Sequence, residues 1–222
     1  MEMNINIQIY QAESLAVEIG VLANFRLRYF REFPYLYVGT EESEQEHIAE
    51  YIANSTARLL IAKDGEKIIG VAIGTMLSTE LEILRRITEP LRNLGIVPER
   101  FYYFGEMILD PAYRHQGLGK QMLERLKTAG REQGVDRFGF FAVFREQNDI
   151  RRPAGYVDSD VIFRKFGFEK TDISISFEWA TIQADGSVGK SPNRLDLWIA
   201  PLDCPPGLNF VDGNRIPVKM LA

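Results

Sequence analysis

The chain is poor in the residues that build disulfides, metal sites and membrane spans. It has one cysteine, Cys204, so no intramolecular disulfide can form and folding does not depend on an oxidising compartment. Its two histidines, His47 and His115, cannot form a familiar zinc site with that single thiol, and no metal is expected. No run approaches the roughly 18 consecutive apolar residues of a membrane helix. Residues 1–6 lack a basic segment followed by an apolar run, so we expect no secretory signal and a cytoplasmic protein.

Charge and length set further limits. The 222 residues include 26 Lys and Arg against 31 Asp and Glu, a formal net charge of −5. Nucleic-acid binders usually carry a basic excess, so we expect no nucleic-acid partner, and no membrane partner either. Apolar residues make up 45% of the chain, which is ordinary for a globular protein with a sizeable core. No linker or repeat divides the sequence, so we expect one domain over residues 1–202 and a C-terminal tail over 203–222.

Hydrophobic periodicity predicts a mixed α+β sheet, because strands and helices alternate in the middle of the chain and strands follow one another elsewhere. The expected strands cover residues 4–10, 58–62, 67–74, 101–109, 137–144, 173–182 and 194–200. The expected helices cover 15–30, a segment beginning after Thr40, a connection within 79–99, 118–131 and 161–166. In the helix after Thr40, spacing places Ile48, Ala49 and Ile52 toward the core.

The most informative segment joins a strand to a helix through a turn with two glycines. It reads Glu106-Met107-Ile108-Leu109-Asp110-Pro111-Ala112-Tyr113-Arg114-His115-Gln116-Gly117-Leu118-Gly119-Lys120. The glycines let the main chain approach a ligand, and the N–H groups of the first helical turn lack intrahelical partners. With the helix dipole and two nearby cationic side chains, these groups favour a phosphate. The spacing fits neither a Walker loop nor the dinucleotide fingerprint, and a plain strand-to-helix turn is the alternative.

The pattern Arg114-x-x-Gly117-x-Gly119, after a strand ending in Leu109-Asp110-Pro111, resembles the acyl-CoA signature of the GNAT superfamily of N-acetyltransferases. The expected order of elements over roughly residues 4–202 is similar to that family's fold. The resemblance implies a mostly antiparallel mixed sheet, splayed between strands 4 and 5, with helices on both faces. It also implies transfer of an acetyl group from acetyl-CoA, the co-substrate, to a primary amine of a small molecule or peptide by direct attack.

The resemblance also assigns residues to the coenzyme. The expected contacts are Met107, Ile108, Leu109, Arg114, His115, Gln116, Gly117, Leu118, Gly119, Lys120 and Phe163. The strand backbone among them is expected to stabilise the thioester oxygen, with a β-bulge freeing its N–H groups. Phe163 falls where the family usually has a tyrosine that protonates the leaving thiolate, and phenylalanine has no proton to give. Tyr156 in the preceding loop is the substitute candidate, with a packing role as the alternative.

Glu106 is the expected catalytic base. A lysine-like amine has a pKa of about 10.4, so the site must remove a proton before the amine can attack. Burial among the neighbouring aromatic residues is expected to raise the pKa of Glu106 into the useful range. The alternatives are a carboxylate on the solvent side of the sheet and one paired with an arginine.

The acceptor is less well defined by the sequence. Phe33, Tyr35 and Tyr37 lie where the family places acceptor contacts, and such rings either hold a cationic amine or anchor the core. The glutamates of the run 41–46 either attract an amine or form a solvated helix face. The C-terminal strands and the tail are candidates for a homodimer contact. Because Phe163 carries no proton, an acyl-CoA-binding sensor or scaffold without turnover is the second candidate function.

Overall fold

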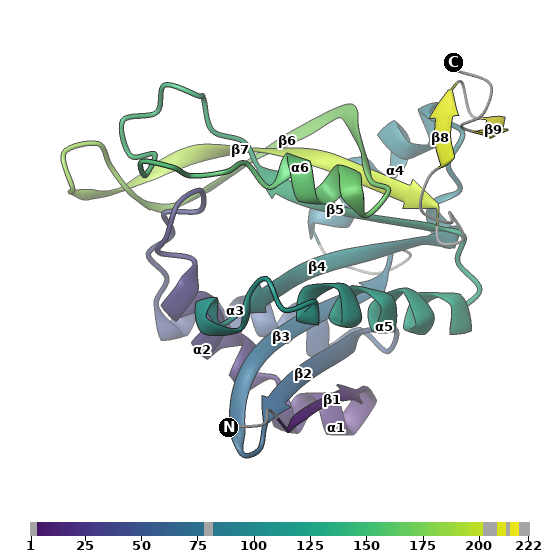
Figure 1. Cartoon of the computed structure of the whole chain (residues 1–222), viewed down its shortest axis with the longest axis horizontal. Helices are drawn as coiled ribbons and strands as arrows, with labels where there is room; N and C mark the ends of the chain where they lie inside the picture. The colour runs from purple at the N-terminus through teal and green to yellow at the C-terminus, as the bar shows by residue number, and fades with distance from the viewer. Residues whose placement is uncertain (1–3, 78–81, 202–207, 212–213, 218–222) are drawn as a thin grey trace.

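The computed structural model describes residues 4–77, 82–201, 208–211 and 214–217, and its main feature is a seven-stranded sheet (Figure 1). The strand order is β1-β2-β3-β4-β5-β7-β6. The strands are β1 (Ile5–Tyr10), β2 (Arg58–Asp64), β3 (Lys67–Met76), β4 (Phe101–Leu109), β5 (Arg137–Val143), β6 (Glu169–Ile182) and β7 (Val188–Pro201). Neighbouring strands are antiparallel except β4 and β5, which are parallel. The expected mixed α+β class is confirmed.

The sheet opens between β4 and β5. The two strands pair only where Phe101–Tyr103 meet Arg137–Gly139, while β4 itself continues to Leu109. Figure 1 shows β4 and β5 diverging from this shared end, with α5 lying along the lower half and α6 along the upper half. The expected splay between strands 4 and 5 is confirmed, and it leaves the second part of β4 facing a gap in the sheet.

Helices cover both faces of the sheet. The first four, α1 (Ala12–Glu18), α2 (Gly20–Tyr29), α3 (Glu41–Ile52) and α4 (Glu82–Asn93), contribute to one core cluster. The helices α5 (Leu118–Glu132) and α6 (Asp160–Lys165) pack on a second cluster across the sheet. Alternate residues of β2 serve the two clusters, since Leu59 and Ile61 belong to the first and Leu60 and Ala62 to the second.

The N-terminal helices differ in two ways from the expectation. The helix expected over 15–30 is two helices that meet at Ile19, next to Gly20, which is a poor helix former. Leu15, Ile19 and Leu22 are all buried. In α3 the buried positions are Glu44, Ile48 and Tyr51, at a spacing of one helical face. The prediction was right for Ile48 and wrong for Ala49 and Ile52, which are exposed.

The C-terminal hairpin of β6 and β7 is longer than expected. The start of β7 contains polar residues, Gly189 and Pro192, which have low strand propensity, so this part of the strand was not predicted. It nevertheless pairs with β6 as far as Val188 and Ile182. In the tail, β8 (Leu208–Val211) and β9 (Asn214–Pro217) form a separate two-stranded sheet that the sequence pattern does not predict. Cys204 lies outside the described residues. None of the helices in the described part of the chain has the length and apolar character needed to span a membrane.

Candidate active site

The turn before α5 is held in shape by its own side chains. Asp110 accepts a hydrogen bond from the Ala112 N–H (3.0 Å) and another from Lys67 Nζ (3.1 Å). Burial raises the pKa of Asp110, but these bonds outweigh burial and the pKa lies below its ordinary value. Arg114 Nε donates to the Leu109 carbonyl (3.1 Å), which ties the end of the turn to the end of β4. The turn therefore presents a fixed backbone to solvent.

The glycines of this turn leave its main chain open. Gly117 has φ +81° and is the N-cap of α5, and His115 also has a positive φ of 62°. A Cβ at Gly117 would meet nothing within 4 Å, and one at Gly119 only Met107 Cε at 3.9 Å. Consecutive N–H groups in such conformations form a concave anion site, and the dipole of α5 adds to it.

Four other residues lie in the turn and the first turn of α5, around that site. Arg114 and Lys120 are exposed beside it and can add positive charge, whereas Leu118 is buried in the core and offers only its backbone. Gln116 Nε2 donates back to the Ala112 carbonyl (3.1 Å). The residues present thus fit the pyrophosphate of a coenzyme A thioester, held by main-chain N–H groups and two cations.

The second half of β4 presents backbone groups to the gap in the sheet. The register of β3 and β4 shifts at Gly105, which is the extra residue of a β-bulge. The Asp110 N–H donates to Ile69 of β3, so alternation directs the N–H groups of Met107 and Leu109 toward the β5 side, where pairing ends at Tyr103. Ile108 is buried in the core and its N–H faces β3. The bulge lies two residues earlier than expected, but the N–H groups at 107 and 109 are directed into the splay.

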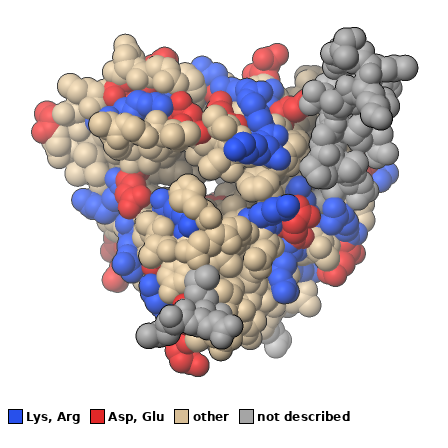
Figure 2. Space-filling view, viewed as in Figure 1, with Lys and Arg blue, Asp and Glu red and all other residues tan. Residues whose placement is uncertain are grey.

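A cavity of about 250 Å³ fills the splay. It is lined by Glu106 and Met107 of β4, by Tyr156 and by Phe163 of α6, so the structure brings these four expected site residues together. Figure 2 shows the surface hollowed between the half that carries α6 and the half that carries α5. The cavity lies between the diverging strands, beside the β4 groups directed into the splay.

Tyr156 is fixed at the wall of this cavity. Its ring packs edge-on against Phe33 at 4.8 Å and lies 5.0 Å from the Arg152 guanidinium, which forms two hydrogen bonds with Asp158. Burial raises the pKa of Tyr156, so its hydroxyl keeps its proton at neutral pH. Phe163 packs between Phe140 (4.7 Å) and Trp198 (5.3 Å) and acts as a wall.

A second cavity of about 670 Å³ lies against α2 and α3. Its lining includes Arg26, His47 and many aromatic rings. Four residues line both cavities: Tyr35, Gly105, Glu106 and Phe141. The bulge and the neighbouring carboxylate therefore stand where a ligand in one cavity would meet a ligand in the other.

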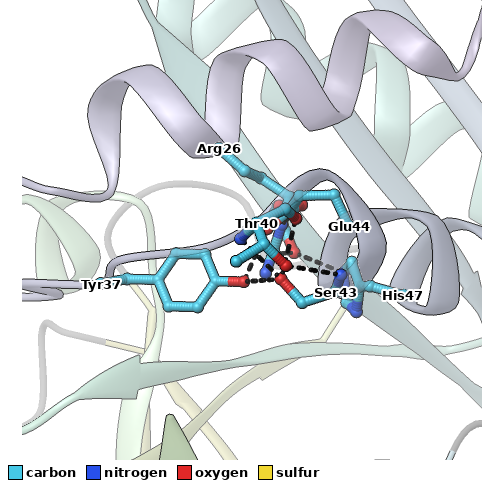
Figure 3. Close-up of polar contacts among 7 residues, drawn as sticks. Arg26, Tyr37, Thr40, Ser43, Glu44 and His47 are labelled. Carbon is cyan, nitrogen blue, oxygen red and sulfur yellow. Dashed lines mark hydrogen bonds and ion pairs between the residues drawn. The ribbon is translucent and has the colours of Figure 1, made fainter. Parts of the chain in front are cut away.

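Glu106 belongs to a buried network of charges that meets at Arg26. Figure 3 shows Arg26, Tyr37, Glu44 and His47 of this network. Arg26 Nη1 donates to Glu106 Oε1, and Arg26 Nε donates to Glu44 Oε2 at 2.5 Å. His47 Nε2 lies 2.8 Å from the same Glu106 oxygen, and Tyr37 donates to Glu44 Oε1 at 2.7 Å. The side chains of Glu106 and Glu44 are 8% and 1% exposed, whereas His47 is 30% exposed. Among the described residues, Glu106 Oε2 is buried and has no hydrogen-bond partner.

This network keeps Glu106 ionised. Burial raises the pKa of Glu106, but the charge of Arg26 and the hydrogen bond from His47 outweigh burial, and the pKa lies below its ordinary value. Burial likewise lowers the pKa of Arg26, and Glu106 and Glu44 more than reverse this effect. The expected rise in the pKa of Glu106 is therefore wrong, and the alternative of a carboxylate paired with an arginine is what the structure has. The expectation considered burial alone and missed the partner on α2.

The sequence analysis missed two members of the network, Arg26 and His47, as site residues, and it named Glu44 only as one of the glutamates that attract an amine or form a solvated helix face. Arg26 and His47 lie 80 and 59 residues from Glu106, and no local pattern joins them. Glu44 did carry a signal, because it falls on the same helical face as Ile48 and Tyr51, where a carboxylate needs a buried partner. Among the described residues, no group of three or more His, Cys, Asp or Glu side chains could hold a metal ion.

Comparison with known proteins agrees with this geometry. The family model of the GNAT acetyltransferases matches residues 23–153, more than half of the chain. A search of curated proteins finds no match. Among solved structures, the chain is similar to the Salmonella typhimurium protein yncA, solved with its cofactor acetyl-CoA (TM-score 0.53, 15% identity, 89% of this chain and 94% of that one).

Two further solved structures share the fold. One is the ribosomal-protein-S18-alanine N-acetyltransferase of Escherichia coli (TM-score 0.51, 14% identity, 93% of this chain and 100% of that one). The other is a mosquito arylalkylamine N-acetyltransferase-like protein (TM-score 0.54, 16% identity, 88% and 100%). At these identities the structures show a common fold. With the family match and the site geometry, they identify the chain as a member of the GNAT family of acetyltransferases, whose co-substrate is acetyl-CoA.

Proposed function

We propose that the protein transfers the acetyl group of acetyl-CoA directly to a primary amine of a small molecule or peptide. The observation that carries this proposal is the position of Gly105 and Glu106, which line both cavities. A donor in the splay and an acceptor in the α2–α3 cavity would meet at these residues. In addition, the buried Glu106 Oε2 lacks a hydrogen-bond donor among the described residues, which favours a ligand N–H there.

The donor side is assigned to the main chain. The N–H groups from 116 to 120, with Arg114 and Lys120, would hold the pyrophosphate, while the walls of the 250 Å³ cavity would exclude water from the thioester. Acetyl-CoA supplies the activated acetyl group. The N–H groups of Met107 and Leu109 are directed into the splay and would stabilise negative charge that develops on the carbonyl oxygen.

Tyr156 is assigned as the proton donor to the departing sulfur. It lines the donor cavity, and its raised pKa keeps the hydroxyl protonated at neutral pH. Phe163 cannot take this role. Because a thiol has a pKa of about 8.5, its thiolate is a tolerable leaving group and the acid assists rather than enables the reaction.

The acceptor cavity favours a positively charged amine with an apolar or aromatic body. Eight aromatic side chains line it: Phe30, Tyr35, Tyr37, Tyr51, Tyr103, Phe141, Phe177 and Trp179. Glu46, Glu50 and Glu178 also line it, and of its two cations Arg26 is paired with two carboxylates and Lys190 with Glu178 (3.7 Å). Aromatic faces and excess carboxylate attract an ammonium and disfavour a carboxylate on the acceptor.

The test combines binding and turnover. Acetyl-CoA is expected to raise the melting temperature, and thiol release is expected with 2-phenylethylamine, about tenfold faster in kcat/KM than with n-butylamine or phenylalanine. n-Butylamine lacks the aryl group and phenylalanine adds a carboxylate. Coenzyme binding without thiol release across a broad panel of amines would favour the sensor or scaffold instead. Absence of any coenzyme A binding would contradict the assignment altogether.

A further inference from the structure

Glu106 is poorly suited to take the proton of the amine. It lies at the meeting point of the two cavities, but Arg26 and His47 both hydrogen-bond the same oxygen and keep the carboxylate ionised. A group with a pKa well below neutral captures a proton inefficiently at neutral pH. Another side chain near the meeting point of the two cavities is therefore needed to accept the proton of the amine.

Most side chains near that meeting point are no better. Tyr35, Tyr51 and Tyr103 line the acceptor cavity, and burial raises the pKa of each, so none is ionised near neutral pH. Glu44 is buried and already accepts bonds from Arg26 and Tyr37. Glu46 and Glu50 line the same cavity from exposed positions on α3.

His47 has the geometry that the others lack. An ionised carboxylate only accepts hydrogen bonds, so the 2.8 Å contact with Glu106 requires a hydrogen on Nε2. In the tautomer with its one hydrogen on Nε2, the ring has a lone pair on Nδ1. The ring is held edge-on against Tyr51 at 5.3 Å, lines the acceptor cavity, and is 30% exposed, which gives a proton a route to solvent. Figure 3 shows His47 of α3 and Arg26 of α2 converging on one cluster of polar groups.

We propose that Nδ1 of His47 accepts the proton of the acceptor amine, and that Glu106 is the positioning residue that fixes the ring and its tautomer. This assignment rests on the proposed acetyl transfer. An ammonium carries three hydrogens on nitrogen and the product amide carries one, so two protons leave. One passes to His47 and then to water through the exposed edge of the ring. The nitrogen lone pair forms the C–N bond as the C–S bond breaks, and the second proton ends on sulfur.

The kinetic test uses His47→Gln. Glutamine keeps an amide N–H that can donate to Glu106 but cannot accept the proton. With 2-phenylethylamine as the probe, kcat/KM at neutral pH is expected to fall by about 100-fold, and kcat/KM should depend less on pH than in the wild type. The acetyl-CoA-induced rise in melting temperature should stay as in the wild type. Gln45→Ala is the control, because Gln45 is exposed on the same helix and does not line the cavity.

A second measurement does not depend on turnover. Long-range ¹H–¹⁵N NMR of the histidine rings, assigned with the His47→Gln variant, is expected to show His47 with its hydrogen on Nε2 at about pH 8. The Glu106→Gln variant is expected to lose this tautomer preference. A hydrogen on Nδ1 in the wild type would overturn the proposal.

Two kinetic outcomes distinguish failure of the His47 assignment from failure of the proposed acetyl transfer. If His47→Gln retains the wild-type pH profile while Glu106→Gln abolishes activity, then Glu106 is itself the base and the inference fails while the acetyl transfer stands. If the wild type binds acetyl-CoA but releases no thiol with any amine, then the proposed function fails and the inference fails with it.

Discussion

The donor side and the acceptor side of this site are built in different ways. The proposed donor side depends mainly on one short stretch of chain, residues 105–120, whose main-chain groups are set by a bulge, a splay and two left-handed residues. The acceptor side uses side chains from α2, α3 and β4 that are 18 to 80 residues apart in sequence. Main-chain sites are robust to most substitutions but fail where conformation changes, whereas a buried charge network fails when one partner is removed.

The largest expected effect comes from removing Arg26. Arg26→Met leaves Glu44 and Glu106 as uncompensated buried carboxylates, so the free energy of unfolding is expected to fall by about 3–5 kcal/mol in urea denaturation. Arg28→Met is the control, because Arg28 is exposed and only stacks on Tyr29, and it should cost less than about 1 kcal/mol. If Arg26→Met lost no more unfolding free energy than Arg28→Met, the network would not contribute to the stability of the fold.

The donor side is tested by a pair of glycines in the same conformation. Gly117 and Gly134 have φ of +81° and +77°, and a Cβ at either would meet nothing within 4 Å. Gly117→Val and Gly134→Val are each expected to lose about 1–3 kcal/mol from backbone strain. Only Gly117→Val should also lose the acetyl-CoA-induced rise in melting temperature, because it alone changes the anion site. If Gly117→Val retained that rise in melting temperature, the coenzyme would have to bind elsewhere than at this turn.

A smaller effect is expected at Tyr156. Tyr156→Phe keeps the ring against Phe33 but removes the proton, so kcat is expected to fall by about 100-fold or less without a change in acetyl-CoA binding. Adding Phe163→Tyr supplies a hydroxyl at another position in the lining of the same cavity and should restore part of the rate. Unchanged kcat in Tyr156→Phe would leave Tyr156 a packing residue.

The smallest expected effect is on acid stability. Because the pKa of Glu106 is lower in the folded protein than its ordinary value of 4.5, its stabilising contribution is present above that value and is lost as the pH falls through the folded-state pKa. Glu106→Gln should therefore flatten the dependence of unfolding free energy on pH in this acidic window. An equally steep dependence in the variant would assign the acid sensitivity to other carboxylates.

This difference also explains what the sequence could predict. The turn around Gly117 and the order of elements follow from glycine chemistry, periodicity and a motif contained in 15 consecutive residues, so local reasoning reaches them. The splay was expected only because that motif resembles the GNAT signature. The bounds of β4 and β5, which lie before the turn and after α5, were also predicted to within a residue or two, because their apolar runs are nearly continuous.

The acceptor side could not be predicted in the same way. The pKa of Glu106 depends on Arg26, which only the packing of α2 against β4 brings near, and burial alone gives the wrong direction. His47 has no motif around it, and its proposed role depends on one contact across 59 residues. The long β7 escapes prediction for a related reason, because its pairing with β6 compensates for residues of low strand propensity.

In the proposed reaction, donor and acceptor occupy the two cavities at the same time and meet at Gly105 and Glu106. Initial rates measured over a matrix of acetyl-CoA and 2-phenylethylamine concentrations test it most directly. Direct transfer predicts intersecting lines in a double-reciprocal plot of rate against substrate concentration. It also predicts no acetylated protein after incubation with acetyl-CoA alone. Parallel lines together with a covalent acetyl adduct would show that the acetyl group first moves to the protein, and would contradict direct transfer between the two cavities.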